Sequence, residues 1–203
     1  MSSYITKILY SPITHLADAR FAAAAGIEYL GFCLNPSHPN FILPIKAKEI
    51  LDWISGSHAV AYFGEQSVEE IIALSELLNM DIVALENNLL PDELPSIGKP
   101  IIKVIDITGK DTIYLHNEFA AYHNYADAFE LKGSFNENVS IEFVKGICAQ
   151  YKVFLSVDFK DLPVRETLLY LQPYAFMLET GEEEKTGLKE YDELNEFLEK
   201  LKL

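Results

Sequence analysis

Positive charge is the scarcest feature of this sequence. Its 203 residues include 16 lysines and arginines against 31 aspartates and glutamates, which gives a formal net charge of −15 at pH 7. Nucleic-acid binding needs basic side chains that neutralise phosphates, and anionic membrane surfaces attract basic segments. We therefore expect neither a nucleic-acid nor a membrane partner, and the excess of acid is typical of a solubilising surface.

Cysteine is also scarce, and long apolar runs are missing. Cys33 and Cys148 lie in apolar settings without CxxC or Cys/His spacing, which argues against a disulfide framework and a zinc site. The five histidines are dispersed and form no i, i+4 pair, so we expect no metal site. No stretch approaches the roughly 18 apolar residues of a membrane helix, and the N-terminal segment lacks signal-peptide features. The expectation is a cytoplasmic protein with reduced thiols.

Short apolar runs alternate with amphipathic segments throughout the chain, which predicts parallel βα units. Eight units of about 25 residues fit a small (β/α)8 TIM barrel, an α/β fold forming a single domain over residues 1–203. The alternative is an open doubly wound sheet, but no G-x-G-x-x-G or Walker A motif supports it, and we expect no cofactor. The predicted strands lie near residues 5–10, 28–34, 58–63, 81–86, 100–106, 127–132, 152–158 and 174–179.

Amphipathic segments fill most of the gaps between these strands. Ser67 with Glu70 has the spacing of a capping box, which predicts that a helix begins there. The predicted helices span residues 15–25, 44–54, 67–79, 114–124, 140–150, 162–171 and 189–202.

Three segments resemble one known family. They are KILYSPITHLADARFAAAAG (residues 7–26), GIEYLGFCLNPSHPNFI (residues 26–42) and LQPYAFMLETGEEEKTGLKE (residues 171–190). They are similar to the phosphoribosylanthranilate isomerase family of tryptophan biosynthesis, and weaker matches continue in register over nearly the whole chain. The resemblance implies a ribulose-phosphate-binding barrel. It also implies an aldose–ketose isomerase that performs the Amadori rearrangement of an N-ribosyl anthranilate.

The residues that carry this reaction in the family are replaced here. The reaction needs a base at the sugar C2 and an acid at the ring oxygen. The family's base is a Cys ending the first strand, where this chain has Leu9, followed by Tyr10 and an apparent insertion. The family's acid is an Asp ending the sixth strand, where this chain has Lys132. Lys132 could donate a proton, or it could form an ion pair with Glu130 on the same strand face.

The anion-binding positions differ in the same way. Asn40 and Glu86 stand where the family has its carboxylate-binding Arg and a fourth-strand His. The family's phosphate loops are glycine-rich, because glycine lets backbone N–H groups approach a phosphate. Here the loops after the seventh and eighth strands carry Asp158 and the run Glu179–Gly181. A carboxylate close to a phosphate is unfavourable by roughly 4 kcal/mol at a surface-like dielectric.

Strand alternation predicts which side chains point into the barrel. The active sites of such barrels lie at the carboxyl ends of the strands, and successive side chains face opposite sides. This places Phe154 and Ser156 inward, together with Glu130, and it places Lys7 in the lower half of the interior. Lys103 is also predicted to face inward. The residues expected at the mouth are Tyr10, Glu86, Lys132, Asp158 and Glu179.

These positions leave three interpretations of function open. The favoured one is a barrel that has lost the parent isomerisation and acts as a non-catalytic binding or scaffold protein. The alternatives are a diverged enzyme, using Lys132 as a Schiff-base or acid residue with Asp158 or Glu86, and retained isomerase activity. An open pocket would favour an enzyme, whereas a mouth plugged by Tyr10, Phe135 or Phe159 would favour a scaffold.

The sequence thus predicts a small-molecule site at the mouth of the barrel. The candidate catalytic residues are Lys132, Asp158 and Tyr10. The candidate ligand-binding residues are Asn40, Glu86, Glu179, Thr180 and Gly181.

Overall fold

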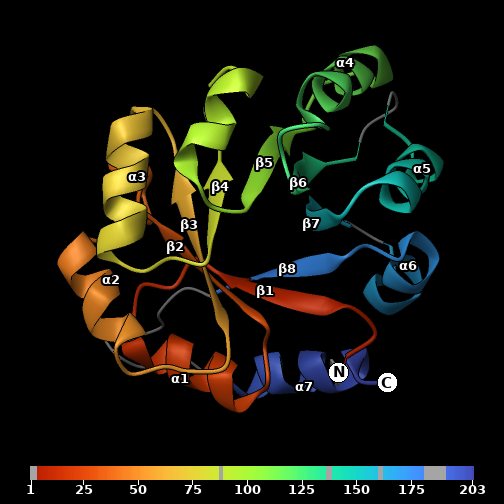
Figure 1. The fold of residues 1–203 in the computed structure, drawn as a ribbon. Coiled ribbons are helices and arrows are strands. Elements are labelled where there is room, and N and C mark those ends of the chain that lie inside the picture. Colours follow the sequence, from red (N-terminus) through yellow and green to blue (C-terminus); the bar gives the residue numbers. More distant parts are fainter. Residues whose placement is uncertain (1–3, 87–88, 136–138, 160–161, 181–190) are drawn as a thin grey trace.

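Parallel strands form the centre of the molecule. The structure is a computed structural model that describes residues 4–86, 89–135, 139–159, 162–180 and 191–203. Within these segments, eight strands close into a barrel in chain order (Figure 1). The predicted (β/α)8 TIM barrel is therefore confirmed, and the open doubly wound sheet is wrong. The strands are β1 (Lys7–Ser11), β2 (Tyr29–Cys33), β3 (His58–Phe63), β4 (Ile82–Leu85), β5 (Ile101–Asp106), β6 (Ala128–Ser134), β7 (Val153–Asp158) and β8 (Ala175–Glu179).

Helices surround these strands (Figure 1). At the start of α3, Ser67 Oγ accepts a hydrogen bond from Glu70 N at 3.3 Å. Glu70 Oε2 in turn accepts one from Ser67 N at 2.9 Å, so the predicted capping box is confirmed. None of the described helices has the length and apolar character needed to cross a membrane. The helices are α1 (Leu16–Ala24), α2 (Pro44–Leu51), α3 (Val68–Leu77), the 3-10 helix η1 (Pro91–Ile97), α4 (Thr112–Tyr122), α5 (Ile141–Gln150), α6 (Val164–Leu171) and α7 (Asp192–Leu201).

The first and last strands close the barrel. They pair in parallel from Lys7 opposite Ala175 to Ser11 opposite Glu179. Because Ser11 and Glu179 are paired, the carboxyl ends of β1 and β8 lie side by side at the mouth. The segments near the two chain ends also contact each other, since Ile5 N donates to Leu201 O at 2.8 Å.

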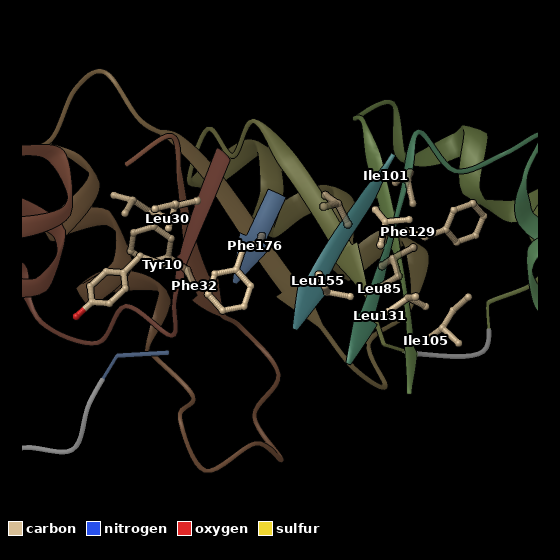
Figure 2. Close-up of a cluster of buried hydrophobic side chains, with 14 of the residues drawn as sticks. Tyr10, Leu30, Phe32, Leu85, Ile101, Ile105, Phe129, Leu131, Leu155 and Phe176 are labelled. Carbon is tan, nitrogen blue, oxygen red and sulfur yellow. The ribbon is translucent and has the colours of Figure 1, made fainter. Parts of the chain in front are cut away.

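Two apolar layers follow from the alternation of side chains along each strand. Between strands and helices lies an outer layer that includes Tyr10, Leu30, Phe32 and Phe176 (Figure 2). At the amino-terminal end of the interior, Lys7 Nζ donates to Tyr174 Oη at 2.7 Å, so the predicted position of this lysine is confirmed. The buried apolar residues of the interior are Leu9, Tyr29, Val60, Tyr62, Ala84, Ile102, Val104, Ala128, Phe154 and Ala175.

The predicted inward direction of Lys103 is wrong. Ile102 and Val104 of β5 belong to the interior, so the intervening Lys103 points toward the helices. Its Nζ lies 4.9 Å from the ring centroid of Tyr122 on α4. Burial lowers the pKa of Lys103, and the charge of Glu118 partly offsets this effect. On β5 it is Asp106 that has the same parity as the interior residues.

Candidate functional site

An open cavity of about 660 Å³ lies at the carboxyl ends of the strands. Each strand contributes to its wall directly or through the residue that follows it, as Glu86 does after β4. Tyr10, Phe135 and Phe159 are not among its lining residues, so these side chains do not plug it. The lining residues are Ser11, Pro12, Thr14, His15, Cys33, His38, Asn40, Tyr62, Glu86, Asp106, Glu130, Lys132, Gly133, Ser134, Ser156, Asp158, Met177, Glu179 and Thr180.

An ion pair spans one side of this cavity. Lys132 Nζ, from β6, donates to Glu86 Oε1 at 2.5 Å, with side chains that are 37% and 20% exposed. The expected pairing of Lys132 with Glu130 is thus replaced by a pairing with Glu86. Burial lowers the pKa of Lys132, but the hydrogen bond and charge of Glu86 outweigh it, and the net pKa is raised. Lys132 is therefore an ammonium group at neutral pH, which suits donation and disfavours Schiff-base formation.

Glu130 lies deeper on the same face of β6 and is 2% exposed. Its Oε2 accepts a hydrogen bond from Tyr62 Oη at 2.5 Å, and its Oε1 accepts one from Ser156 Oγ at 2.8 Å. Burial raises the pKa of Glu130, while the two hydrogen bonds and the charge of Lys132 act in the opposite direction. The predicted inward direction of Glu130, Lys132 and Ser156 is confirmed by these contacts and by the cavity lining.

Three further carboxylates lie at the rim. Asp158 ends β7, Glu179 ends β8, and Asp106 ends β5, and all three line the cavity with exposed side chains. Asp106 Oδ1 accepts a hydrogen bond from Thr108 N at 2.8 Å. Sequence reasoning missed Asp106 because it assigned the wrong parity to β5.

The remaining predicted ligand residues also reach the cavity where the structure describes them. Asn40 lines the cavity from the loop after β2, and its N–H donates to His38 Nδ1 at 3.1 Å. Thr180 Oγ1 donates to Pro12 O at 2.8 Å, and Thr180 N donates to Ser11 O at 3.1 Å. These two bonds join the ends of β1 and β8. Gly181 lies outside the described residues.

The predicted position of Tyr10 at the mouth is wrong. Tyr10 is 1% exposed and packs in the outer layer, with its ring centroid 6.4 Å from that of Phe21 on α1 (Figure 2). Burial raises the pKa of Tyr10, which makes its hydroxyl a poor base near neutral pH. The inward residues of β1 are Leu9, which is fully buried, and Ser11, which lines the cavity. The prediction was therefore wrong by one residue: it placed Tyr10 at the mouth, whereas Ser11 lines the cavity.

The cavity is strongly acidic. The carboxylates of Glu86, Asp106, Glu130, Asp158 and Glu179 line it, whereas Lys132 is the sole lysine or arginine among its described lining residues. Glu86 already neutralises that lysine. Among the described residues, no group of three or more His, Cys, Asp or Glu side chains is arranged to hold a metal ion. The arrangement is suited to accepting hydrogen bonds from hydroxyl groups and to moving protons, and it disfavours a phosphate at the ends of β7 and β8.

Several known proteins that are similar to this chain carry the name of one enzyme, although no family model matches the chain. The N-(5'-phosphoribosyl)anthranilate isomerase of Aquifex aeolicus (strain VF5) is 28% identical over 211 residues, which cover 98% of this chain and 99% of that protein. The crystal structure of phosphoribosyl anthranilate isomerase from Thermus thermophilus is 27% identical with a TM-score of 0.78. The aligned region covers 97% of this chain and 98% of the Thermus thermophilus chain.

A further solved structure carries a bound ligand. It is a phosphoribosyl anthranilate isomerase in complex with reduced 1-(o-carboxyphenylamino)-1-deoxyribulose 5-phosphate, and its TM-score is 0.81 with the same coverage of 97% and 98%. Its identity is 19%, so this likeness supports the fold alone.

Proposed function

We propose that this chain is a member of the phosphoribosylanthranilate isomerase family and acts as an intramolecular isomerase, because the Aquifex aeolicus enzyme is similar to it over 98% of its length. Its substrate is a sugar-derived small molecule that binds in the cavity at the barrel mouth. The observation that carries the proposal is the ion pair between Lys132 and Glu86, because it holds a proton donor at the family's acid position.

The cavity supports this proposal by its size and openness. A volume of about 660 Å³ lies within the range of roughly 300–1,000 Å³ that small-molecule sites occupy. Its carboxylates can accept hydrogen bonds from several sugar hydroxyls at once. Tyr10, Phe135 and Phe159 are not among the lining residues, so these three side chains do not fill the cavity.

Lys132 acts as the proton donor in this proposal. Opening the ring of a glycosylamine breaks the bond between C1 and the ring oxygen, and the oxygen must gain a proton as it leaves. A raised pKa makes Lys132 a weak acid, but an alkoxide is far more basic than an amine, so the transfer is still favourable. Glu86 fixes the ammonium group in position and keeps it protonated.

The decisive assay uses two substrates that differ only in their phosphate. Purified protein is incubated with N-(5'-phosphoribosyl)anthranilate and with N-ribosylanthranilate, and the rearranged products are quantified. We expect turnover of at least one substrate and a loss of at least a hundredfold in kcat for Lys132→Met. The matched control is Lys46→Met, because Lys46 is an exposed lysine on α2 whose side chain is 65% exposed. An active Lys132→Met variant would remove Lys132 from the mechanism.

A second candidate function is non-catalytic ligand binding. The observation that favours it is the position of Leu9, since the residue at the family's base position is an apolar side chain that is fully buried. In that case the chain would bind the reduced product analogue, or its unphosphorylated counterpart, in a calorimetric titration without turning over either substrate. Turnover of either substrate excludes this candidate.

A further inference from the structure

A buried carboxylate lines the cavity between two apolar neighbours on the adjacent strands. Glu130 lies opposite Val104 of β5 and Phe154 of β7 in the strand register, and both neighbours are apolar interior residues. Such barrel layers are normally filled with apolar side chains, and burying a carboxylate costs free energy. A carboxylate that is 2% exposed yet lines an open cavity therefore calls for a functional explanation.

We infer that Glu130 is the general base of this site, the group that removes the C2 proton of the opened sugar. The inference rests on the proposed function, because it assigns a residue to that reaction. It supplies the group that the first strand lacks, since Leu9 cannot accept a proton.

The geometry of β6 brings this base and the proton donor to the same ligand. Glu130 and Lys132 are two residues apart on one strand, so their side chains share a face and their Cα atoms are about 6–7 Å apart. In the substrate, C2 and the ring oxygen are both bonded to C1. One sugar ring can therefore contact Lys132 with its ring oxygen and Glu130 with its C2 hydrogen.

The contacts of Glu130 orient it without using up its basicity. Tyr62 Oη and Ser156 Oγ each donate to a different carboxylate oxygen, and both are neutral hydroxyl groups. Each carboxylate oxygen has a further lone pair that can accept a proton. Glu86, by contrast, is engaged by the ammonium of Lys132, and Asp106 lies at the exposed rim.

The proton transfers balance. Lys132 gives a proton to the ring oxygen as the C1–O bond breaks, which leaves a protonated imine at C1. Glu130 takes the C2 proton, the C2–H electrons form a C1–C2 double bond, and the imine electron pair returns to nitrogen. Glu130 then delivers its proton to C1 while the C2 hydroxyl becomes a carbonyl and returns a proton to Lys132. No oxidant, reductant or cofactor is required.

The surroundings of Glu130 strengthen it as a base. Burial raises its pKa, against the opposing hydrogen bonds from Tyr62 and Ser156. The charged and titratable groups that face it are Tyr62 from β3, Glu86 after β4, and Lys132 from its own strand.

The test compares isosteric variants under the two-substrate assay in D₂O. We expect Glu130→Gln to lower kcat by about 10²–10⁴-fold with little change in KM, and to lower the rate of deuterium incorporation at C1 of the product by the same factor. Glu69→Gln, on the exposed first turn of α3, is the matched control and should behave like the wild type.

A pH profile separates a base from a structural residue. Activity should rise with pH as Glu130 loses its proton. Tyr62→Phe should move this rise to higher pH, because it removes a hydrogen bond that lowers the pKa of Glu130. Ser156→Ala should move it in the same direction and provides a second variant should Glu130→Gln fold poorly.

Two outcomes would overturn the inference, and they differ in what else they affect. Wild-type turnover that survives in Glu130→Gln, with an unshifted profile in Tyr62→Phe, removes Glu130 as the base and leaves the isomerase proposal intact. Absence of turnover by the wild type with both substrates removes the isomerase proposal and the base assignment together.

Discussion

Lys132 on β6 and Glu86 after β4 are joined by a hydrogen bond of 2.5 Å along one side of the cavity, although 46 residues separate them in the chain. The pair lies at the position where the resemblance places the family's catalytic acid. Lys132 replaces the family's acid in the sequence, and in the structure Glu86 holds its ammonium group at the wall of an open cavity. The chemistry of this site therefore depends on a partner that the position of Lys132 alone does not reveal.

Removing the carboxylate of this pair should destabilise the fold moderately. We expect Glu86→Gln to lower the free energy of unfolding by about 1–2 kcal/mol, between the values typical of exposed and buried pairs, because both side chains are partly buried. Urea unfolding at pH 7 measures the change. The matched control is Asp52→Asn, which breaks the exposed pair of Lys48 and Asp52 and should cost less than about 0.5 kcal/mol.

The same pair has a defined pH dependence. Glu86 raises the pKa of Lys132 in the folded state. The stabilisation is therefore fully present below the unfolded lysine pKa of about 10.4 and is lost as pH rises through the folded pKa. Equal destabilisation by Glu86→Gln at pH 7 and far above pH 10 would contradict this assignment.

For Glu130 it is the neutral form that the folded state favours, whereas for Lys132 it is the charged form. Its pKa is raised in the folded state, so the native protein holds this proton more tightly than the unfolded chain does. Its contribution is fully present below the unfolded pKa of about 4.3 and is lost as pH rises through the folded pKa. Glu130→Gln should therefore gain stability relative to the wild type as pH rises from 4 to 8, as measured by urea unfolding at several pH values. A difference that is constant with pH would show that Glu130 titrates normally.

Most of the fold could be predicted from the sequence, because its signals are local. Eight apolar runs alternate with helical segments, and the capping box at Ser67 lies within four residues of sequence. The inward direction of Glu130 and Lys132 also followed from alternation along a single strand. These predictions needed no knowledge of neighbouring strands.

The errors arose where the parity of a strand had to be chosen. Tyr10 and Lys103 each lie one position away from a residue that faces inward, and a shift of one residue reverses every side chain. The partners of Glu130 were not predictable for a different reason. Tyr62 lies 68 residues away in the chain and Ser156 lies 26 residues away, so only barrel closure brings them together.

Replacing Gly133 and Gly146 with alanine should change the stability of the protein in opposite directions. Gly133 has φ of +110°, and a Cβ there would lie 2.3 Å from Thr108 Oγ1 and 2.7 Å from Asp106 Oδ1. We expect Gly133→Ala to destabilise the protein by about 1–3 kcal/mol and to disturb the cavity rim. Gly146 lies within α5, where a Cβ meets nothing within 4 Å, so Gly146→Ala should stabilise by about 0.5–1 kcal/mol. Thermal unfolding of both variants provides the comparison, and a loss of stability in Gly146→Ala would contradict the stated environment.

The carboxylates of Asp158 and Glu179, at the ends of β7 and β8, should weaken the binding of a phosphate in the cavity. Neutralising them in the double variant Asp158→Asn, Glu179→Gln removes two like charges from the positions where the resemblance places the family's phosphate loops. Both side chains are exposed and screened by salt, so we expect a gain of about 1 kcal/mol for the pair, or roughly fivefold in affinity for the reduced phosphorylated product analogue. Calorimetric titration at low salt measures this change, with the unphosphorylated analogue as the control ligand. Equal gains for both analogues would show that the two carboxylates act on the sugar or the ring rather than on the phosphate.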